Sequence, residues 1–331
     1  MNVREIVLAK LANPYFDDKV SLNFEIDERL LRFIEENRIS LLLKERGVET
    51  KIARRDEWKL KALIKEMRGI VREFERGGID YAIIKFPEFP RAHRDIDILI
   101  DRSQIKKVDG ILRNLGYKEK KAQEVNKKAY FRVIGKDIMD IDIHLELGWW
   151  GVTYLNSVSI LEHSEMWEFK DFEIKKPCAE HELLISASTT LFGELCLTLF
   201  DLIYAKALID KGISLAHARE IALSNNWLRQ FNYFIETVDA LYNNIWGRHR
   251  HTGLKNVSFP YRIPLGKIFS TRMGKTASDF KSHGLRRGTR DLWGYMLEIS
   301  QLGIDYVRER LSIPSHPIFD MRRFLRGENH V

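Results

Sequence analysis

Two short segments of this chain place acidic side chains at every second position among branched apolar residues. In the first segment, residues 94–100 (RDIDILI), Asp95 and Asp97 alternate with isoleucines. The second segment, residues 137–147 (DIMDIDIHLEL), repeats the pattern around Asp142. Because consecutive side chains of a β-strand point to opposite faces, each segment would form a strand with one apolar and one acidic face. A fold that contains both strands must bury the apolar faces and provide partners for the negative charges.

The acidic face of the second segment carries Asp140, Asp142, His144 and Glu146. Two carboxylates on one strand and another on a nearby strand repel one another unless a cation lies among them. Oxygen ligands suit Mg²⁺ or Mn²⁺, and two such ions roughly 4 Å apart serve phosphoryl and nucleotidyl transfer. Taken alone, either segment could instead be an edge strand whose alternate acidic side chains point toward water. The apolar flanks and the second acidic strand favour the cation site.

Hydrophobic periodicity places helices on both sides of a small group of strands. Strands are expected over residues 81–85, 94–100, 128–134 and 138–147. Helices are expected over residues 26–46, 56–77, 103–115, 179–193, 195–212, 214–224, 226–245 and 288–310. The helix before the first strand should end at Gly77 and Gly78, and the helix after the second strand should begin at Ser103 and stop at Gly116.

This pattern predicts an α+β fold, with a small mixed sheet flanked by helices, a helical N-terminal segment and a mainly helical C-terminal half. We expect three parts. Residues 1–77 would form a helical segment that packs on the core, residues 78–150 the core that holds the sheet, and residues 151–331 a helical domain.

Length and composition are those of a folded cytoplasmic protein. The 331 residues are 44% hydrophobic and 31% charged, which allows a sizeable core. The N-terminal residues are charged throughout, and no apolar run approaches the roughly 18–20 residues that a membrane span needs. The two cysteines, Cys178 and Cys196, lack the spacing of a zinc site or a disulfide framework.

The basic residues are concentrated near the C-terminus. Residues 241–331 hold 16 of the 54 Lys and Arg but only 7 of the 47 Asp and Glu, so the formal net charge of +7 arises there. Such asymmetry favours an anionic partner, and the basic region 246–290 suggests RNA, with tRNA as a candidate. A solvated helical surface is the alternative.

Several of these segments together resemble a known family. The shared residues are Asn37–Leu42, Ile83–Lys85, Arg94–Ile100, Leu115–Tyr117, Ile141–Leu147, Glu180–Leu184 and Asp201–Leu202. In this order they resemble the uncharacterised nucleotidyltransferase family of the DNA polymerase β-like superfamily, over roughly residues 25–212. The resemblance implies a palm-like core and a transferase that binds ATP or another NTP together with Mg²⁺.

The same resemblance assigns roles to the acidic residues. Asp95 and Asp97 would be the first two metal ligands, and Asp142 would be the third carboxylate, which also serves as general base. His144 would hold a phosphate or orient Asp142, and a structural histidine is the alternative. Asp140 matches no position of the superfamily and is interpreted as a solvated acid at the strand end.

The sequence departs from the superfamily at the phosphate-binding loop. Most members have two glycines, or glycine and serine, after the first strand, so that backbone amides can approach the triphosphate. Here Phe86 and Pro87 occupy the place, and proline lacks an amide donor. Nucleotide binding would therefore fall to side chains. The candidates are Lys85, Arg91, His93, Arg94, His144, Asp201 and Lys206.

Three functions remain open. The leading hypothesis is a Mg²⁺-dependent nucleotidyltransferase that moves NMP from an NTP to an acceptor hydroxyl. The second is a catalytically degenerate protein that binds nucleotide or RNA as a regulator, which the missing glycines would explain. The third is a structural protein whose acids face water and bind no metal.

Overall fold

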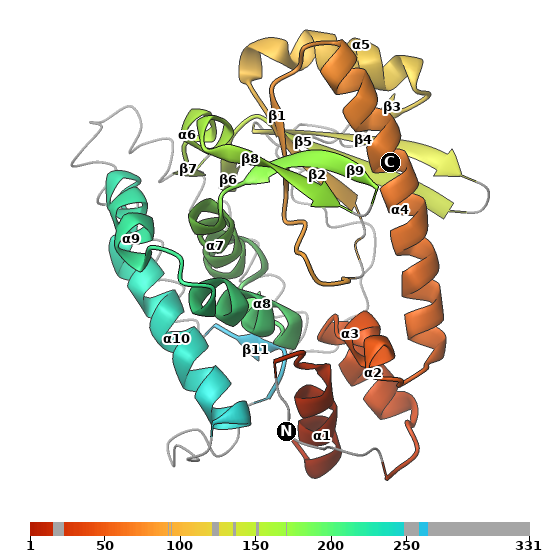
Figure 1. Ribbon diagram of the computed structural model, residues 1–331, viewed down its shortest axis with the longest axis vertical. Coiled ribbons are helices and arrows are strands. Elements are labelled where there is room, and N and C mark those ends of the chain that lie inside the picture. Colours follow the sequence, from red (N-terminus) through yellow and green to blue (C-terminus); the bar gives the residue numbers. More distant parts are fainter. Residues whose placement is uncertain are drawn as a thin grey trace, which may run out of the picture.

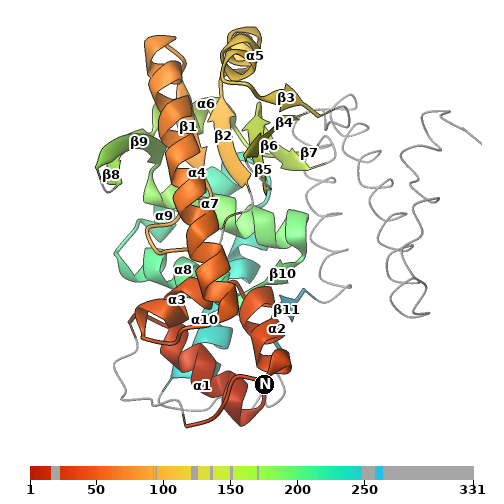
Figure 2. The same ribbon diagram turned by 90° about the vertical axis from the view of Figure 1, so that its right-hand side faces the viewer.

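The computed structural model describes most of the chain up to residue 247 (Figure 1). The described ranges are residues 1–15, 23–91, 93, 95–120, 126–134, 137–149, 152–169, 171–247 and 258–263. Within them, a sheet with its covering helices forms one layer, further helices form a second, and one long helix runs alongside both (Figures 1 and 2).

A five-stranded mixed sheet forms the centre of the first layer. Its strands are β1 (Tyr81–Ile84), β2 (Asp95–Ile100), β3 (Lys118–Glu119), β4 (Lys127–Ile134) and β5 (Asp137–His144), in the order β1-β2-β5-β4-β3. β2 and β5 are parallel, and the other neighbouring pairs are antiparallel. Their parallel pairing requires a crossover, which includes η1 (Arg102–Gln104) and α5 (Ile105–Asn114).

The apolar face of this sheet packs on helices. Ile96, Ile98, Ile141 and Ile143 are at most 2% exposed and lie in one core. The other side of that core comes from α4 (Lys51–Arg76) and α5. α4 begins at Thr50, whose side chain accepts a hydrogen bond from the Ala53 amide. The helix is long enough to extend past the sheet to the N-terminal helices (Figure 2).

The second layer is helical and has its own core around Trp227 and Phe231. Its elements are α7 (Ala179–Ser188), the π-helical turn η2 (Thr189–Glu194), α8 (Leu199–Asp210), α9 (Leu215–Ser224) and α10 (Leu228–Trp246). α1 (Val3–Ala12), α2 (Glu28–Glu36) and α3 (Ser40–Glu45) complete it. Buried residues of α1, α2 and α3 belong to the same core as those of α7, α8 and α10, so the N-terminal helices are part of this layer.

Further short elements connect the two layers. They are β6 (Leu147–Trp149) and β7 (Val152–Leu155), α6 (Ser157–Glu162), β8 (Ser164–Phe169) and β9 (Phe172–Pro177), and the pair β10 (Cys196–Leu197) and β11 (Tyr261–Arg262). The sequence analysis assigned no elements to residues 151–178. β8 and β9 pair only with each other in a two-stranded sheet, and much of β8 is exposed, which weakens the hydrophobic signal.

The expected α+β class and the four main strands are confirmed to within three residues at each end, and α4 ends at Gly77 as expected. Three details differ. The helix expected over 26–46 is broken into α2 and α3 at Arg38, whose φ is +58°. Asp101, rather than Ser103, caps the helical turn before α5, because its carboxylate accepts from the Ser103 amide. The helix expected over 195–212 begins only at Leu199.

The helix expected over 288–310 lies outside the described residues. Among the described helices, none combines the length and the apolar composition that crossing a membrane requires.

The packing of the sheet on α4 predicts a large effect of truncating Ile98, which is fully buried. Ile98→Ala should lower the free energy of unfolding by about 2–5 kcal/mol, because it removes buried methyl groups and leaves a cavity. Val133→Ala, on a side chain that is 60% exposed, should change it by less than about 1 kcal/mol. Chemical denaturation of both variants measures the difference, and equal effects would contradict this account of the core.

Candidate active site

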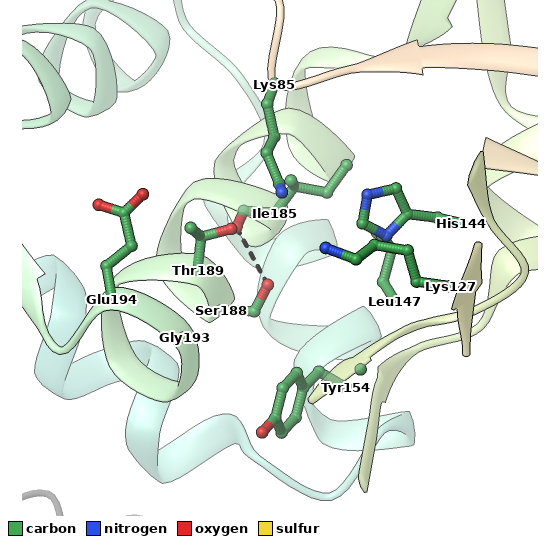
Figure 3. Close-up of a pocket in the computed structure, with 11 residues that line it drawn as sticks. Lys85, Lys127, His144, Leu147, Tyr154, Ile185, Ser188, Thr189, Gly193 and Glu194 are labelled. Carbon is green, nitrogen blue, oxygen red and sulfur yellow. Dashed lines mark hydrogen bonds between the residues drawn. The ribbon is translucent and has the colours of Figure 1, made fainter. Parts of the chain in front are cut away.

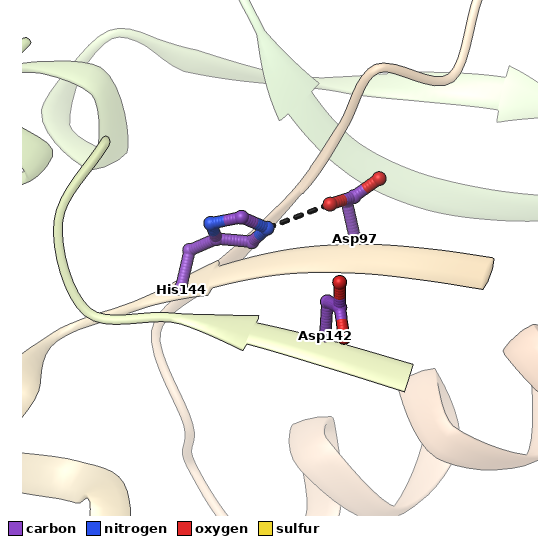
Figure 4. Close-up of side chains that lie close together, drawn as sticks. All are labelled: Asp97, Asp142 and His144. Atoms are coloured by element: carbon purple, nitrogen blue, oxygen red, sulfur yellow. Dashed lines mark hydrogen bonds and ion pairs between the residues drawn. The ribbon is translucent and has the colours of Figure 1, made fainter. Parts of the chain in front are cut away.

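The acidic side chains gather where β2 and β5 run side by side. The strand register places Asp97 beside Asp142 and Asp95 beside Asp140. Ligand atoms of Asp97, Asp142 and His144 all lie within 4.8 Å of one another (Figure 4). Asp95 is on the same face but does not join this group of three. The group therefore contains two of the three expected carboxylates, together with His144.

Two lysines neutralise this group. Lys85 Nζ lies 2.9 Å from Asp97 Oδ1, and Lys127 Nζ lies 2.8 Å from Asp142 Oδ2. The register explains both contacts, since Ile84, the residue before Lys85, pairs with Asp97, and Lys127 pairs with His144. Each carboxylate thus has a cation at the position where charge repulsion would otherwise be largest.

His144 provides a further contact to the same carboxylate. Its Nε2 lies 2.6 Å from Asp97 Oδ1. Burial lowers the pKa of His144 despite the attraction of Asp97, so the imidazole is neutral and donates this hydrogen bond. Burial alone would raise the pKa of Asp97, but Lys85 and His144 together lower it below its ordinary value. Asp97 is therefore ionised at neutral pH.

Asp95 lies in a different electrostatic environment. Burial, followed by the negative charge of Asp97, raises the pKa of Asp95 to about 6. The charges of Lys85 and Lys127 act in the opposite direction but do not offset burial and the neighbouring carboxylate. A carboxyl group perturbed in this way is a candidate for a functional site.

The backbone at Lys85 is in the left-handed region, with φ +58°. Glycine adopts such a φ without a steric penalty, whereas here a lysine does so, directly before Phe86. A lysine there costs roughly 1–2 kcal/mol. The conformation carries the Lys85 side chain toward Asp97 rather than along the strand direction.

A cavity of about 270 Å³ lies beside this group, between the end of the sheet and the helical layer (Figure 3). Lys85, Lys127 and His144 line its sheet side. Leu147 and Gly148 of β6 and Tyr154 of β7 also line it, and the helical layer contributes Ile185, Ser188, Thr189, Gly193 and Glu194. Three of these residues belong to η2, and π-helical turns are rare and frequently occur at functional sites.

A second cavity shares Lys85, Ile185, Thr189 and Glu194 with the first. It also contains Arg91 and Asp201, two of the residues expected to bind nucleotide. Asp201 forms the capping box of α8 with Thr198, and it lies 3.9 Å from an Arg91 guanidinium nitrogen. Both residues are therefore at the cleft, and Asp201 also has a structural role.

The remaining predicted residues lie differently. His93 stacks on Phe86 with ring centroids 4.9 Å apart, and burial, together with the charge of Arg91, lowers the pKa of His93 to about 3. A neutral imidazole cannot pair with phosphate as a cation. Arg94 lies outside the described residues.

Lys206 does not line either cavity. Its Nζ lies 2.9 Å from Asp210 and 3.4 Å from Asp239. Lys206 follows Asp201 by five positions, which turns the two side chains about 140° apart on a helix.

Asp140 also differs from the expectation of a solvated acid. It is partly buried, and its Oδ2 lies 2.8 Å from Lys120 Nζ. Among the charged residues that line the two cavities, the sequence analysis did not predict Lys127, Arg38, Glu182 and Glu194 as site residues. Lys127 could have been found from the β4–β5 hairpin, because extending its register to the start of β4 places Lys127 opposite His144.

The group fits a divalent cation chemically. Asp97 and Asp142 supply carboxylate oxygens close to one another, and His144 holds Asp97 through its Nε2 hydrogen. Oxygen ligands suit Mg²⁺ or Mn²⁺. The two lysines that now contact the carboxylates carry the positive charge that such an ion would bring.

Comparisons with solved structures found four matching chains, and the two described below have low TM-scores. One is the lincosamide antibiotic adenylyltransferase LnuA with bound lincomycin, at 24% identity and a TM-score of 0.33, covering 45% of this chain and 97% of that one. The other is ANT(2")-Ia in complex with adenylyl-2"-tobramycin, at 13% identity and a TM-score of 0.28, covering 54% of this chain and 98% of that one. No curated protein matches the chain.

The comparison with protein families is more informative. The family described as uncharacterised nucleotidyltransferase matches residues 28–243, well over half of the chain. The matched region contains the sheet, the acidic group and the residues that line both cavities. The chain therefore belongs to the uncharacterised nucleotidyltransferase family and is an enzyme of nucleotidyl transfer.

Proposed function

We propose that this enzyme is a divalent-metal-dependent nucleotidyltransferase that moves NMP from an NTP to an acceptor hydroxyl. The observation that carries the proposal is the register of Asp97 with Asp142 on parallel strands, beside His144 and at the edge of a cavity. This arrangement supplies carboxylates where a triphosphate and an attacking hydroxyl would meet.

In the proposed reaction, an oxygen of the acceptor attacks the α-phosphorus of the NTP. A new phosphorus–oxygen bond forms, the bond to the bridging oxygen of the β-phosphate breaks, and pyrophosphate leaves. Mg²⁺ or Mn²⁺ held by Asp95, Asp97 and Asp142 would supply charge neutralisation and an activated hydroxyl. Asp142 takes the hydroxyl proton, and His144 orients Asp97.

Lysines act in the same site by exchanging partners. Lys85 and Lys127 each contact one carboxylate, and both also line the first cavity. When a divalent ion neutralises the carboxylates, these ammonium groups are available to phosphate oxygens of the bound nucleotide. Lys85 lines both cavities and is thus placed to contact the triphosphate at its centre.

The expected division into residues 1–77, 78–150 and 151–331 is proposed here as a division of roles rather than of independently folded units. The sheet carries the metal ligands, and the other two parts close the cleft. Buried residues from the first and third parts share one core, so these parts would not separate without exposing apolar surface.

RNA remains a proposed acceptor on the strength of the basic region 246–290, most of which lies outside the described residues. A hydroxyl on a protein or a small molecule would satisfy the same chemistry. A regulatory protein that binds nucleotide without catalysis is the second candidate, because Phe86 occupies the phosphate loop and lysines already pair with both carboxylates.

Metal binding tests the first part of the proposal. Asp97→Asn and Asp142→Asn should each weaken Mn²⁺ binding at least about 10-fold, because each removes a charged ligand. Asp140→Asn, on the same face but paired with Lys120, is the matched control and should retain wild-type affinity. Calorimetric titration with Mn²⁺ measures all three. Equal affinities in every variant would show that the metal lies elsewhere.

Transfer itself tests the second part. The enzyme is incubated with each of the four labelled NTPs, Mg²⁺ and separate cellular fractions of RNA, protein and small molecules. We expect label to move into one fraction, with pyrophosphate released. Asp95→Asn, Asp97→Asn and Asp142→Asn should each lower the rate at least about 100-fold, because charge at the reacting phosphate is no longer compensated. Undiminished transfer by any two of these folded variants contradicts the mechanism.

Nucleotide binding distinguishes the enzyme from the regulatory alternative. For the enzyme, calorimetry with ATP, GTP, CTP and UTP should show tight binding of at least one nucleotide only when Mg²⁺ is present, since the carboxylates repel an uncompensated triphosphate. Nucleotide binding that is independent of Mg²⁺ and unaffected by Asp97→Asn, without transfer to any fraction, would favour the regulator.

A further inference from the structure

The second cavity contains an unusual concentration of arginine. Arg38, Arg91 and Lys85 line it, together with Glu194 and Asp201. Arg38 comes from the corner between α2 and α3, whereas Arg91 comes from the loop between β1 and β2. Two guanidinium groups from distant parts of the chain thus meet beside the lysine that contacts Asp97.

The hydrogen-bonding capacity of these arginines is only partly used. Arg91 lies 3.9 Å from Asp201, which is beyond hydrogen-bonding distance, and its buried Nε has no hydrogen-bond partner among the residues that the structure describes. Arg38 contacts both oxygens of Glu194, at 2.9 and 2.8 Å, but is also 3.9 Å from Asp201. A buried guanidinium nitrogen without an acceptor is costly unless a ligand supplies one.

Both arginines are held firmly in position. The Asn37 side chain and backbone accept hydrogen bonds from the amides of Leu199 and Phe200, at 3.2 and 3.3 Å, and this fixes the corner that carries Arg38. Arg91 lies over the ring of Phe200, 5.2 Å from its centroid. Because the Leu199 and Phe200 amides at the start of α8 already donate to Asn37, they are not available to an anion. An anion would therefore have to bind the arginines.

The loop that carries Arg91 is anchored at both ends. Phe86 is 4% exposed and packs edge-on against Phe169, with centroids 5.0 Å apart. Further along, Phe89 packs on Tyr204, and Glu88 forms an ion pair with Lys211. The aromatic residues that replace the usual glycines therefore fix the loop against both layers and present Arg91 to the cavity.

Backbone strain is concentrated around the same cavity. Among the described residues, four that are not glycine have a left-handed φ: Arg38, Lys85, Leu195 and Asn226. Two of them line the second cavity, and Leu195 directly follows Glu194, which also lines it. Each such residue costs of the order of 1–2 kcal/mol, and strain of this kind clusters at functional sites.

We propose that Arg38 and Arg91 form an anion site for the β- and γ-phosphates of the nucleotide, and hence for the pyrophosphate that leaves. This inference rests on the proposed function and assigns to Arg38 a role that the sequence analysis did not give it. Glu194 and Asp201 hold the guanidinium groups in the absence of ligand. The phosphate oxygens then replace these carboxylates as acceptors, and the two arginines perform the task of the missing glycine loop.

The test uses inorganic pyrophosphate as the probe, titrated calorimetrically into metal-free full-length enzyme, with orthophosphate for comparison. Pyrophosphate should bind more tightly than orthophosphate, because it can contact both guanidinium groups. Arg38→Met and Arg91→Met should each weaken pyrophosphate binding about 10- to 100-fold, which is the range for charge-assisted hydrogen bonds. Glu194→Gln should tighten it about two- to fivefold, because a competing carboxylate is removed.

Arg55→Met is the matched control, since Arg55 also pairs with two carboxylates, those of Glu35 and Asp56, but lies away from the cleft. It should leave pyrophosphate affinity unchanged. Unchanged affinity in Arg38→Met and Arg91→Met, or an equal loss in Arg55→Met, overturns the proposal. If Arg38→Met fails to fold, Arg38→Lys replaces it. Lysine keeps the positive charge but should still weaken pyrophosphate binding, because an ammonium group cannot donate the bidentate hydrogen bonds of a guanidinium.

The outcome is separable from that of the proposed function. Metal-free Asp97→Asn should bind pyrophosphate at least as well as the wild-type enzyme, because the arginine site contains no metal ligand. If the aspartate variants retained transfer, the catalytic proposal would fail while the arginine result stood. Loss of pyrophosphate binding in metal-free Asp97→Asn would instead overturn the arginine site.

Discussion

The structure depends on bringing two carboxylates together at one point of a sheet. Asp97 and Asp142 are adjacent because β2 and β5 are parallel and in register, and that register is fixed by the isoleucines on the opposite face. A slip by one residue would bury the acids against α4 and expose the isoleucines. The hydrophobic core thus determines the geometry of the charged group, and the repulsion within this group is compensated by Lys85, Lys127 and His144.

The loop after β1 shows how a fold can keep a site while losing its usual sequence. Glycine at positions 86 and 87 would provide open amides. Here Phe86 and Pro87 stand there, and Phe86 packs against His93 and Phe169. Lys85, directly before them, has a left-handed φ. The ion pair between Lys85 and Asp97 offsets part of the strain that this backbone costs.

Much of the sheet could be predicted from the sequence, because its signals are local. Period-two alternation identified β2 and β5 and placed Asp95, Asp97 and Asp142 on one face, and Gly77 marked the end of α4. The helical layer was predicted less accurately at its boundaries. The π-helical turn η2 and the delayed start of α8 depend on tertiary contacts, such as those of Asn37, that no local pattern reveals.

The residues that the sequence analysis missed are those whose position depends on contacts between distant segments. Arg38 lies more than 50 positions before Asp97, and only the docking of the α2–α3 corner on α8 brings it to the cleft. An arginine in a left-handed conformation at that corner is less favourable than glycine or asparagine would be. The turn itself would be more stable with glycine or asparagine at position 38. We therefore attribute the arginine at this position to the contacts of its side chain. The docking of the N-terminal helices on α8 thus places Arg38 at the second cavity, and the proposed anion site depends on this docking.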